Sequence, residues 1–303
     1  MNLPFEAEPI LPRHTRRLQE IFASTGKSAW CYYAPFLCCF SLAPAREVFV
    51  AEHDGALWLP VRRVDRGGRV RFDLVVPPIP LSAEPLVAVL NRMRAINAGR
   101  YPRILWVDEA DSRRLPPDRV EIRIKSKEYL YDPSKVAAAE GRPYRDLRKK
   151  LSRFRRGADP LFRELTPADI TACQALLRHW RKRQGRKRDF LLDWGYTRSA
   201  LSMYGQWTSD ELQGWCVELE GRVAAFAIAG RMHARLANFF IAKTDPDVRG
   251  LSEYLRMEVY RALVDYDLVN DAGDLGLQGL RQHKRKFRPV ELIPVYSASF
   301  SDR

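Results

Sequence analysis

The alternation of apolar and polar residues divides the first half of the chain into predicted strands and helices. Two apolar runs within residues 47–64 flank Asp54-Gly55, a pair that is typical of a tight β-hairpin. Residues 84–98 carry apolar side chains every three or four positions, which predicts a helix. A helix at 12–22 and strands at 70–76, 103–107 and 120–130 complete this half.

The second half repeats a similar order of elements. Strands are predicted at 161–165, 215–219, 223–230, 236–243, 268–271 and 290–296, and helices after Thr166-Pro167, at 200–208, after Arg249-Gly250 and at 277–287. Strands that alternate with helices favour a mixed sheet with helices on its faces. We therefore predict an α/β fold with mixed α+β sheets. Two similar domains, at 1–133 and 159–303, suggest an internal duplication, and residues 134–158 form the linker between them.

The linker is predicted to contain a helix with two chemically different faces. Pro143 stands at a favoured first position for a helix. The apolar residues that follow fall on one stripe, namely Tyr144, Leu147, Leu151 and Phe154. Because the remaining surface is basic, we expect the stripe to pack against the protein and the basic face to be exposed.

Positive charge is concentrated in three short segments. The 303 residues have a formal net charge of +14. Residues 142–156 contain eight bases and one acid, residues 178–188 contain seven bases and no acid, and residues 281–288 contain five bases. A chain that is basic only for solubility would scatter these residues. The pattern therefore predicts a polyanionic partner, which is RNA, an anionic membrane surface or a nucleotide. The alternative is three solvated faces of arginine-rich helices.

Composition excludes several classes of protein. A hydrophobic content of 46% is too high for a disordered chain. The longest nearly uncharged stretch, at 34–45, is too short to span a membrane. The first nine residues carry two acids and no base, unlike a secretory signal. Five cysteines without a C-x-x-C pair indicate neither a disulfide framework nor a zinc site. We expect a cytoplasmic protein without a metal, with peripheral association at the inner membrane face as a further expectation.

Two segments resemble motifs of a known family. Residues 127–154 contain KEYLYDP and then GRPYRDLRKKLSRF, and residues 270–289 read NDAGDLGLQGLRQHKRKFRP. Their order and spacing resemble the linker and last-helix motifs of the phosphatidylglycerol lysyltransferase C-terminal family, over nearly the whole chain. The resemblance implies two tandem GNAT-like domains, related to the Fem-type transferases that use aminoacyl-tRNA. One departure is Arg148-Lys149-Lys150, where the family has Lys-Arg-Asn.

The resemblance also implies a site within the last motif. Lys284 matches a lysine that stabilises charge during transfer in the Fem-type group. Asp274 can accept a proton or bind the ammonium group of an aminoacyl donor, and Asn270 begins the motif. The alternatives are that Lys284 is one exposed base among five and that Asp274 caps the following helix.

The resemblance therefore predicts an aminoacyltransferase. It moves an amino acid from aminoacyl-tRNA to an amine or hydroxyl acceptor, either a lipid head group or a small molecule. Aminoacyl-tRNA is a co-substrate, no further cofactor is expected, and DNA is not a partner. The residues predicted to contact the tRNA are Arg145, Arg148, Lys149, Lys150, Arg153, Arg181, Lys182 and Arg183.

Two alternatives stay open at this point. A GNAT acetyltransferase would bind coenzyme A pyrophosphate through R/Q-x-x-G-x-G/A before a long helix. In that case Arg249 and Gly250 would contact the cofactor, although Asp247 places a negative charge in the loop. The second alternative is a non-catalytic tandem GNAT that binds RNA or a membrane, with Trp180 and Trp194 stacking on bases or lying at the lipid interface.

Overall fold

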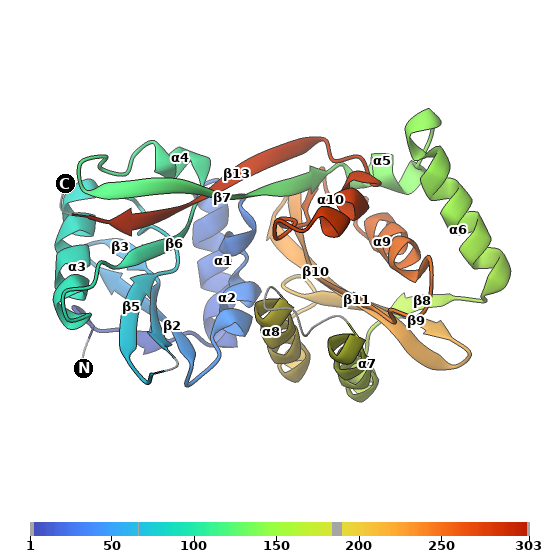
Figure 1. Cartoon of the computed structure of the whole chain (residues 1–303), viewed down its shortest axis with the longest axis horizontal. Coiled ribbons are helices and arrows are strands. Elements are labelled where there is room, and N and C mark those ends of the chain that lie inside the picture. Colours follow the sequence, from blue (N-terminus) through green and yellow to red (C-terminus); the bar gives the residue numbers. More distant parts are fainter. Residues whose placement is uncertain (1–2, 66, 184–189, 302–303) are drawn as a thin grey trace. The chain divides into compact units, whose positions relative to one another are not determined.

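The computed structural model describes residues 3–65, 67–183 and 190–301, which form two compact units (Figure 1). Unit 1 comprises residues 1–14, 40–127 and 293–303, and unit 2 comprises residues 15–39 and 128–292. Both units are therefore built from separate segments of the chain. The predicted domains, at 1–133 and 159–303, and the linker at 134–158 stay a prediction. So does the internal duplication.

Unit 1 is built on strands in the order β1-β2-β4-β5-β6-β13, with β3 paired to β2. Their bounds are β1 Glu8–Pro9, β2 Arg46–His53, β3 Ala56–Trp58, β4 Pro60–Val64, β5 Val70–Leu74, β6 Arg103–Val107 and β13 Glu291–Phe300. The predicted turn at Asp54-Gly55 connects β2 to β3 and brings Ala51 opposite Trp58. Both turn residues have positive φ, as a tight hairpin turn requires.

Helix α3 (Ala83–Ile96) supplies much of the core of unit 1. Its buried residues are Leu86, Val89, Leu90 and Met93, which confirms the stripe predicted from the three- and four-residue spacing. They share a hydrophobic cluster with Leu74 and Ile104, which lie opposite each other on the parallel strands β5 and β6. A short helix, α4 (Glu109–Ser112), begins at Asp108, whose side chain accepts a hydrogen bond from the Asp111 amide.

Unit 2 contains the end of β7, from Glu128 onward, and strands in the order β7-β12-β11-β10-β9-β8. Their bounds are β7 Val120–Tyr131, β8 Leu161–Glu164, β9 Gln213–Leu219, β10 Arg222–His233, β11 Leu236–Thr244 and β12 Leu268–Asn270. Only β11 and β12 are parallel among these pairs, with Leu236 opposite Leu268 and Asn238 opposite Asn270. Because β12 ends at Asn270, this pairing stops there and the chain turns toward the last motif.

Helices cover both faces of the unit 2 sheet. Figure 1 shows α9 on one side of β10 and β11, and α7 and α8 on the other. The bounds are α1 Thr15–Ser24, α2 Ala34–Phe40, α5 Pro133–Ala138, α6 Arg145–Gly157, α7 Ile170–Arg183, α8 Phe190–Ser202, α9 Leu251–Ala262 and α10 Gln278–Arg285. Ala225, Ala227 and Ala229 of β10 alternate into the cluster that α9 covers. Within the described ranges, no helix combines the length and the apolar character that crossing a membrane requires.

One helical prediction needs correction, and one short helix has a sequence signal without a prediction. The helix predicted at 200–208 is wrong in position, because α8 covers Phe190–Ser202 and only a 3-10 turn at Tyr204–Gln206 follows. Helix α5 was not predicted, although its signal is present in the sequence. Asp132 accepts a hydrogen bond from the Lys135 amide at 3.0 Å, and Pro133 occupies the first turn.

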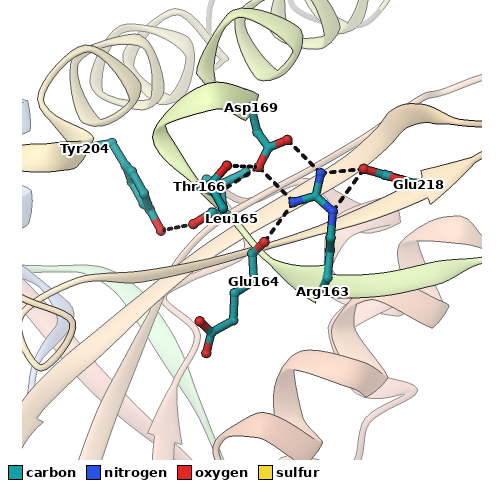
Figure 2. A network of polar contacts seen from close by, with 7 residues as sticks. All are labelled: Arg163, Glu164, Leu165, Thr166, Asp169, Tyr204 and Glu218. Carbon is teal, nitrogen blue, oxygen red and sulfur yellow. Dashed lines mark hydrogen bonds and ion pairs between the residues drawn. The ribbon is translucent and has the colours of Figure 1, made fainter.

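A polar network ties β8 and β9 to the turn that begins α7 (Figure 2). The Arg163 guanidinium donates to both carboxylate oxygens of Asp169, at 2.7 and 2.8 Å, and its Nε donates to Glu218 at 3.0 Å. Asp169 also accepts from the Thr166 amide at 2.8 Å, so the first turn begins at the predicted Thr166. One arginine therefore fixes the connection between two strands and a helix.

Candidate functional site

The buried side chain of Lys284 lies at the centre of the candidate site. Helix α10 carries Lys284, which is 3% exposed, while its neighbours Arg281 and Arg285 are exposed. The Lys284 ammonium donates to the backbone carbonyl of Asp271 and lies 3.1 Å from the Asp271 Oδ1 atom. Lys284 is therefore held by the residue that directly follows β12.

A second buried cation shares the Asp271 carboxylate. Arg256 of α9 is 8% exposed, and its Nη1 atom donates to Asp271 Oδ2. Its guanidinium also lies over the Phe239 ring, with the Cζ atom 4.8 Å from the ring centroid. Asp271 itself is 4% exposed. The cluster thus contains two buried cations and one buried carboxylate.

This arrangement changes the acidity of Lys284. Burial lowers the pKa of Lys284 to about 8, the Asp271 carboxylate raises it, and the Arg256 guanidinium lowers it. An ordinary lysine is almost fully protonated at pH 8, because its pKa is about 10.4. Lys284 can therefore exist as either an ammonium or a neutral amine near physiological pH, which is uncommon and is a property of many functional lysines.

Asn270 supports the site through Glu128. The Asn270 side chain is fully buried, and its Nδ2 atom donates to Glu128 Oε2 at 2.8 Å and to the Ser28 carbonyl at 2.9 Å. Its Oδ1 atom accepts from the Ala272 amide at 2.9 Å. Glu128 is 5% exposed and also accepts from the Trp30 amide at 2.8 Å. Asn270 therefore fixes the turn after β12.

Asp274 is engaged by two donors. Its Oδ2 atom accepts from the Tyr129 hydroxyl at 2.7 Å and from Arg281 Nε at 2.8 Å. Burial alone would raise the pKa of Asp274, but these two hydrogen bonds hold it below its usual range. The Tyr129 ring in turn lies over Lys284, with Nζ 5.6 Å from the ring centroid. The first residue of α10 is Gln278, so Asp274 does not cap that helix.

The structure brings the three predicted residues Asn270, Asp274 and Lys284 to one end of β12. Sequence reasoning did not assign a role to Asp271, Arg256 or Tyr129, which connect them. A signal for Arg256 exists, because Glu253, Arg256 and Tyr260 recur at three- and four-residue spacing among the apolar residues of α9 and are all buried. Charged residues on a buried helix face require partners, so this pattern indicates a buried ion pair.

The basic segment at 281–288 is not a solvated positive face. Arg281 pairs with Asp274, Lys284 is buried beside Asp271, and Lys286 pairs with Glu253 at 2.7 Å. The Arg288 guanidinium donates to the Pro143 carbonyl. Most of the positive charge that the sequence shows here is used in internal contacts.

Helix α6 has the two predicted faces. Tyr144, which precedes it, and the residues Leu147, Leu151 and Phe154 are buried in the unit 2 core. Among its bases, Lys150 pairs with Glu253 at 3.3 Å, and Arg148 donates to the carbonyls of Ala139 and Gly141. These contacts hold α6 against the unit.

Three other cations of α6 face solvent. Arg145, Lys149 and Arg153 are exposed, and within the described part of the chain they form no ion pair. They stand four residues apart, so they form one row along the helix with successive Cα atoms about 6 Å apart. Like charges at this spacing repel each other by about 0.2–0.5 kcal/mol per pair. A row of this kind favours an anionic partner.

The second basic segment divides into paired and stacked residues. On α7, Arg183 pairs with Asp247 at 2.6 Å, and Arg181 stacks on Trp194 with Cζ 3.8 Å from the ring centroid. Lys182 is exposed. Trp180 is 9% exposed, and the Lys243 ammonium lies 4.8 Å from its ring centroid. Three further bases of this segment, Arg186, Lys187 and Arg188, lie outside the described residues.

The loop before α9 differs from a pyrophosphate-binding loop. Gly250 has a φ of +87°, and a Cβ atom there would lie 3.2 Å from Phe154 Cβ, so α6 packs directly on this glycine. Asp247 is paired with Arg183 and with His179, at 3.1 Å. Arg249 is exposed. The chain thus contacts this loop at Gly250 and at Asp247.

The same loop and helix α7 bring together three groups of the type that can bind a metal. His179, Asp245 and Asp247 bring one ligand atom each within 4.8 Å of one another. Arginines already neutralise both carboxylates, because Arg222 pairs with Asp245 at 3.1 Å and Arg183 pairs with Asp247. The group therefore behaves as an ion-pair cluster between α7 and the loop.

Comparison with known proteins adds the family and the fold. The family model for the phosphatidylglycerol lysyltransferase C-terminal region matches residues 45–299. No curated protein matches the chain in sequence. A conserved protein of unknown function from Bacteroides thetaiotaomicron aligns with a TM-score of 0.78 and 20% identity, covering 99% of this chain and 100% of that one.

Two further solved structures share the fold. L-PGS from Bacillus licheniformis aligns with a TM-score of 0.63 and 14% identity, covering 95% of this chain and 92% of that one. FemX aligns with a TM-score of 0.56 and 9% identity, covering 96% and 97%. The predicted fold class is confirmed, because these neighbours include tandem GNAT proteins. The family match over most of its length shows that this chain belongs to the phosphatidylglycerol lysyltransferase C-terminal family, a family of aminoacyltransferases.

Proposed function

We propose that this chain transfers an amino acid from aminoacyl-tRNA to an amine or hydroxyl acceptor, either a lipid head group or a small molecule. The observation that carries the proposal is Lys284, a buried amine held by Asp271 within the motif that resembles the family. Its pKa of about 8 gives it both protonation states near physiological pH. This property is of direct use in acyl transfer.

The chemistry of the reaction needs few groups. An aminoacyl ester is already activated, so the site must orient the acceptor, receive its proton and stabilise the charge that forms on the carbonyl or leaving oxygen. Lys284 serves the last two tasks. In this proposal Asn270 and Asp274 support the site. Asn270 donates a hydrogen bond to Glu128, and Asp274 accepts hydrogen bonds from Tyr129 and Arg281.

The exposed cations supply the contact with the tRNA backbone. Arg145, Lys149 and Arg153 form the row on α6, and Lys182 adds an exposed charge on α7. Phosphate contacts of this type position a nucleic acid without reading its sequence. The exposed face of α6 carries no large apolar residue, and its apolar stripe is buried, so the helix lacks the feature that inserts into a lipid surface.

The loop geometry speaks against the acetyl-CoA alternative. A pyrophosphate would need the amides at the start of α9, where Phe154 packs on Gly250 and Glu253 lies in the first turn. The hydrogen bond from Lys286 holds the pKa of Glu253 at about 2, although burial acts to raise it. Glu253 is therefore ionised at physiological pH and pairs with Lys286 and Lys150, which engages both lysines beside this turn.

A screen of charged tRNAs tests the proposal. Purified protein is incubated with tRNAs carrying labelled amino acids, together with vesicles of phosphatidylglycerol or with small amines as acceptors. We expect loss of label from one tRNA and a labelled product. The Lys284→Ala variant should slow the single-turnover rate by roughly a hundredfold or more, as the loss of a charge-stabilising group does. The exposed neighbour Arg285, changed to Ala, is the matched control and should transfer at the parent rate.

Other outcomes would decide against the proposal. A protein that shifts charged tRNA in a gel without consuming it is a binding module. Consumption of acetyl-CoA by the parent protein, with Lys284→Ala as active as the parent, would favour the acetyltransferase alternative. Circular dichroism of each variant confirms that any loss of transfer does not come from unfolding.

A further inference from the structure

The buried ion cluster around Lys284 contains one more cation than it has carboxylates. Asp271 accepts from Arg256 through Oδ2, while Lys284 lies beside Oδ1 and donates to the carbonyl of the same residue. The exposed fractions of Asp271, Arg256 and Lys284 are 4%, 8% and 3%. An uncompensated buried charge is costly, so the cluster favours loss of one proton. Lysine is the member that can lose it, because arginine stays protonated.

Among the described residues, the other acids compensate Lys284 less than Asp271 does. On β7, the buried Glu128 carboxylate accepts from Asn270 and from the Trp30 amide. Asp274 raises the pKa of Lys284 less than Asp271 does. On the loop before α10, the Asp274 carboxylate accepts hydrogen bonds from Arg281 and Tyr129. On α9, the Glu253 carboxylate forms ion pairs with Lys286 and Lys150. The remaining neighbours are neutral near pH 7, because burial lowers the pKa of His283 to about 3 and raises the pKa values of the tyrosines: Tyr129, Tyr131 and Tyr260.

The geometry also fixes the direction of the Lys284 hydrogen bonds. A neutral amine has two N–H donors and one lone pair. The carbonyl and the Oδ1 atom of Asp271 provide two acceptors for the donors. The lone pair is then left to accept a proton from another group.

We infer that Arg256 is a positioning residue that acts through Asp271, and that by sharing this carboxylate it leaves Lys284 able to accept and return a proton. The inference rests on the proposed function and adds a residue that the family motif does not contain. If Arg256 were uncharged, Asp271 would compensate Lys284 alone and hold it as an ammonium. The shared carboxylate thus converts a fixed cation into a proton shuttle.

The transfer step then balances without a further reactant. The acceptor nitrogen or oxygen attacks the ester carbonyl carbon with its lone pair, and the proton that it loses passes to Nζ of Lys284. The bond between the carbonyl carbon and the ribose oxygen breaks with its electron pair on that oxygen. The oxygen takes the proton back from Lys284. The products are the aminoacylated acceptor and a tRNA with a free ribose hydroxyl.

The titration of Lys284 can be measured without any substrate. The Lys284 side chain is followed by NMR of lysine-labelled protein between pH 6 and 11, with the signal assigned from Lys284→Met. We expect Arg256→Met to raise the pKa of Lys284, and Asp271→Asn to lower it, each by roughly one unit or more, as expected for gain or loss of a neighbouring charge. Arg256→Lys keeps the charge and should leave the pKa near that of the parent.

Transfer provides a second readout. The pH at which the single-turnover rate reaches half its maximum should move in the same direction as the NMR titration, with little change in the donor KM. A purely structural role for Arg256 would lower the rate at all pH values without moving this midpoint.

The outcomes separate the inference from the proposed function. An unmoved Lys284 titration in a folded Arg256→Met protein would overturn the inference, whatever Asp271→Asn shows. If Arg256→Met does not fold, Arg256→Gln takes its place and should raise the pKa of Lys284 in the same way. Opposite shifts in a protein that transfers no amino acid would establish that Arg256 acts on Lys284 and would reject the aminoacyl transfer proposed above.

Discussion

The burial of Lys284 has a cost to the fold at neutral pH. Its pKa falls from 10.5 to about 8, so the folded state binds this proton more weakly than the unfolded chain does. The penalty is fully present below pH 8 and disappears as the pH rises through 10.5, with an upper size of ~3 kcal/mol. Without Lys284, Asp271 and Arg256 would form a neutral ion pair, so the penalty comes from the Lys284 ammonium.

Lys284→Met should therefore stabilise the protein while it removes the amine. We expect the free energy of unfolding at pH 7 to rise by about 1–3 kcal/mol, and the gain to shrink above pH 10. Urea unfolding at both pH values measures it, with Arg285→Met as the exposed control, which should change stability by less than ~0.5 kcal/mol. A Lys284→Met protein less stable than the parent at pH 7 would show that the ammonium is well compensated.

At this scale the sequence identifies residues but not their partners. Asn270, Asp274 and Lys284 stand in one motif of 20 residues and could be named from it. Asp271 pairs with Arg256, and the Tyr129 hydroxyl donates to Asp274, between residues that are far apart in the sequence. These contacts depend on the pairing of β12 with β7 and on the packing of α9, which no local pattern contains.

Among the elements, the connection held by Arg163 depends on the charge of Asp169 and therefore on pH. The hydrogen bonds from Arg163 hold the pKa of Asp169 well below its usual range, and Asp169 in turn raises the pKa of Arg163 (Figure 2). A carboxylate with a lowered pKa stabilises the fold above its unfolded pKa, which is about 3.9 for aspartate, and the contribution is lost as the pH falls below that value.

Arg163→Met should destabilise unit 2 at pH 7 by about 1–2 kcal/mol, because Asp169 and Glu218 then lose their shared donor. The difference from the parent should shrink as the pH falls below 4, because Asp169 then takes up a proton in the unfolded chain while the folded parent still holds it ionised. Urea unfolding across this range is the measurement. Arg222→Met, which breaks a single ion pair with Asp245, is the control. A constant difference at all pH values would contradict the role of the Asp169 charge.

The elements that the sequence predicted best are those with a long apolar period. Helix α6 follows the expected stripe because its buried residues recur every three or four positions over 13 residues. The helix predicted at 200–208 is misplaced, since α8 begins at Phe190, directly after a run of bases that has no apolar period. Short helices such as α5 depend on caps rather than on periodicity.

Across the whole molecule, the net charge of +14 divides into internal and external parts. Most bases of the segment at 281–288 form internal contacts, including ion pairs with Asp271, Asp274 and Glu253. The row on α6 is external, and its buried stripe fixes the direction in which it faces. A count of bases along the sequence does not separate these two uses, because the acids that pair with them lie elsewhere in the chain.

The external row should determine how strongly tRNA binding depends on salt. Each neutralised phosphate contributes a slope of about −0.7 to −0.9 to the plot of log K against log salt. Changing Arg145, Lys149 and Arg153 to Glu should flatten this slope by roughly two units and weaken binding at low salt. Arg148 is left unchanged, because its guanidinium donates to the Ala139 and Gly141 carbonyls.

The matched control separates position from net charge. Arg92, Arg100 and Lys127 are exposed bases of unit 1, and changing all three to Glu alters the total charge by the same amount. We expect this control to keep the parent slope, because its bases lie outside the row. Filter binding of deacylated and charged tRNA from 50 to 300 mM salt gives all three slopes. Equal losses in both triple variants would mean that the protein attracts RNA through its net charge alone. Parent binding that does not change with salt would reject the phosphate contacts of α6.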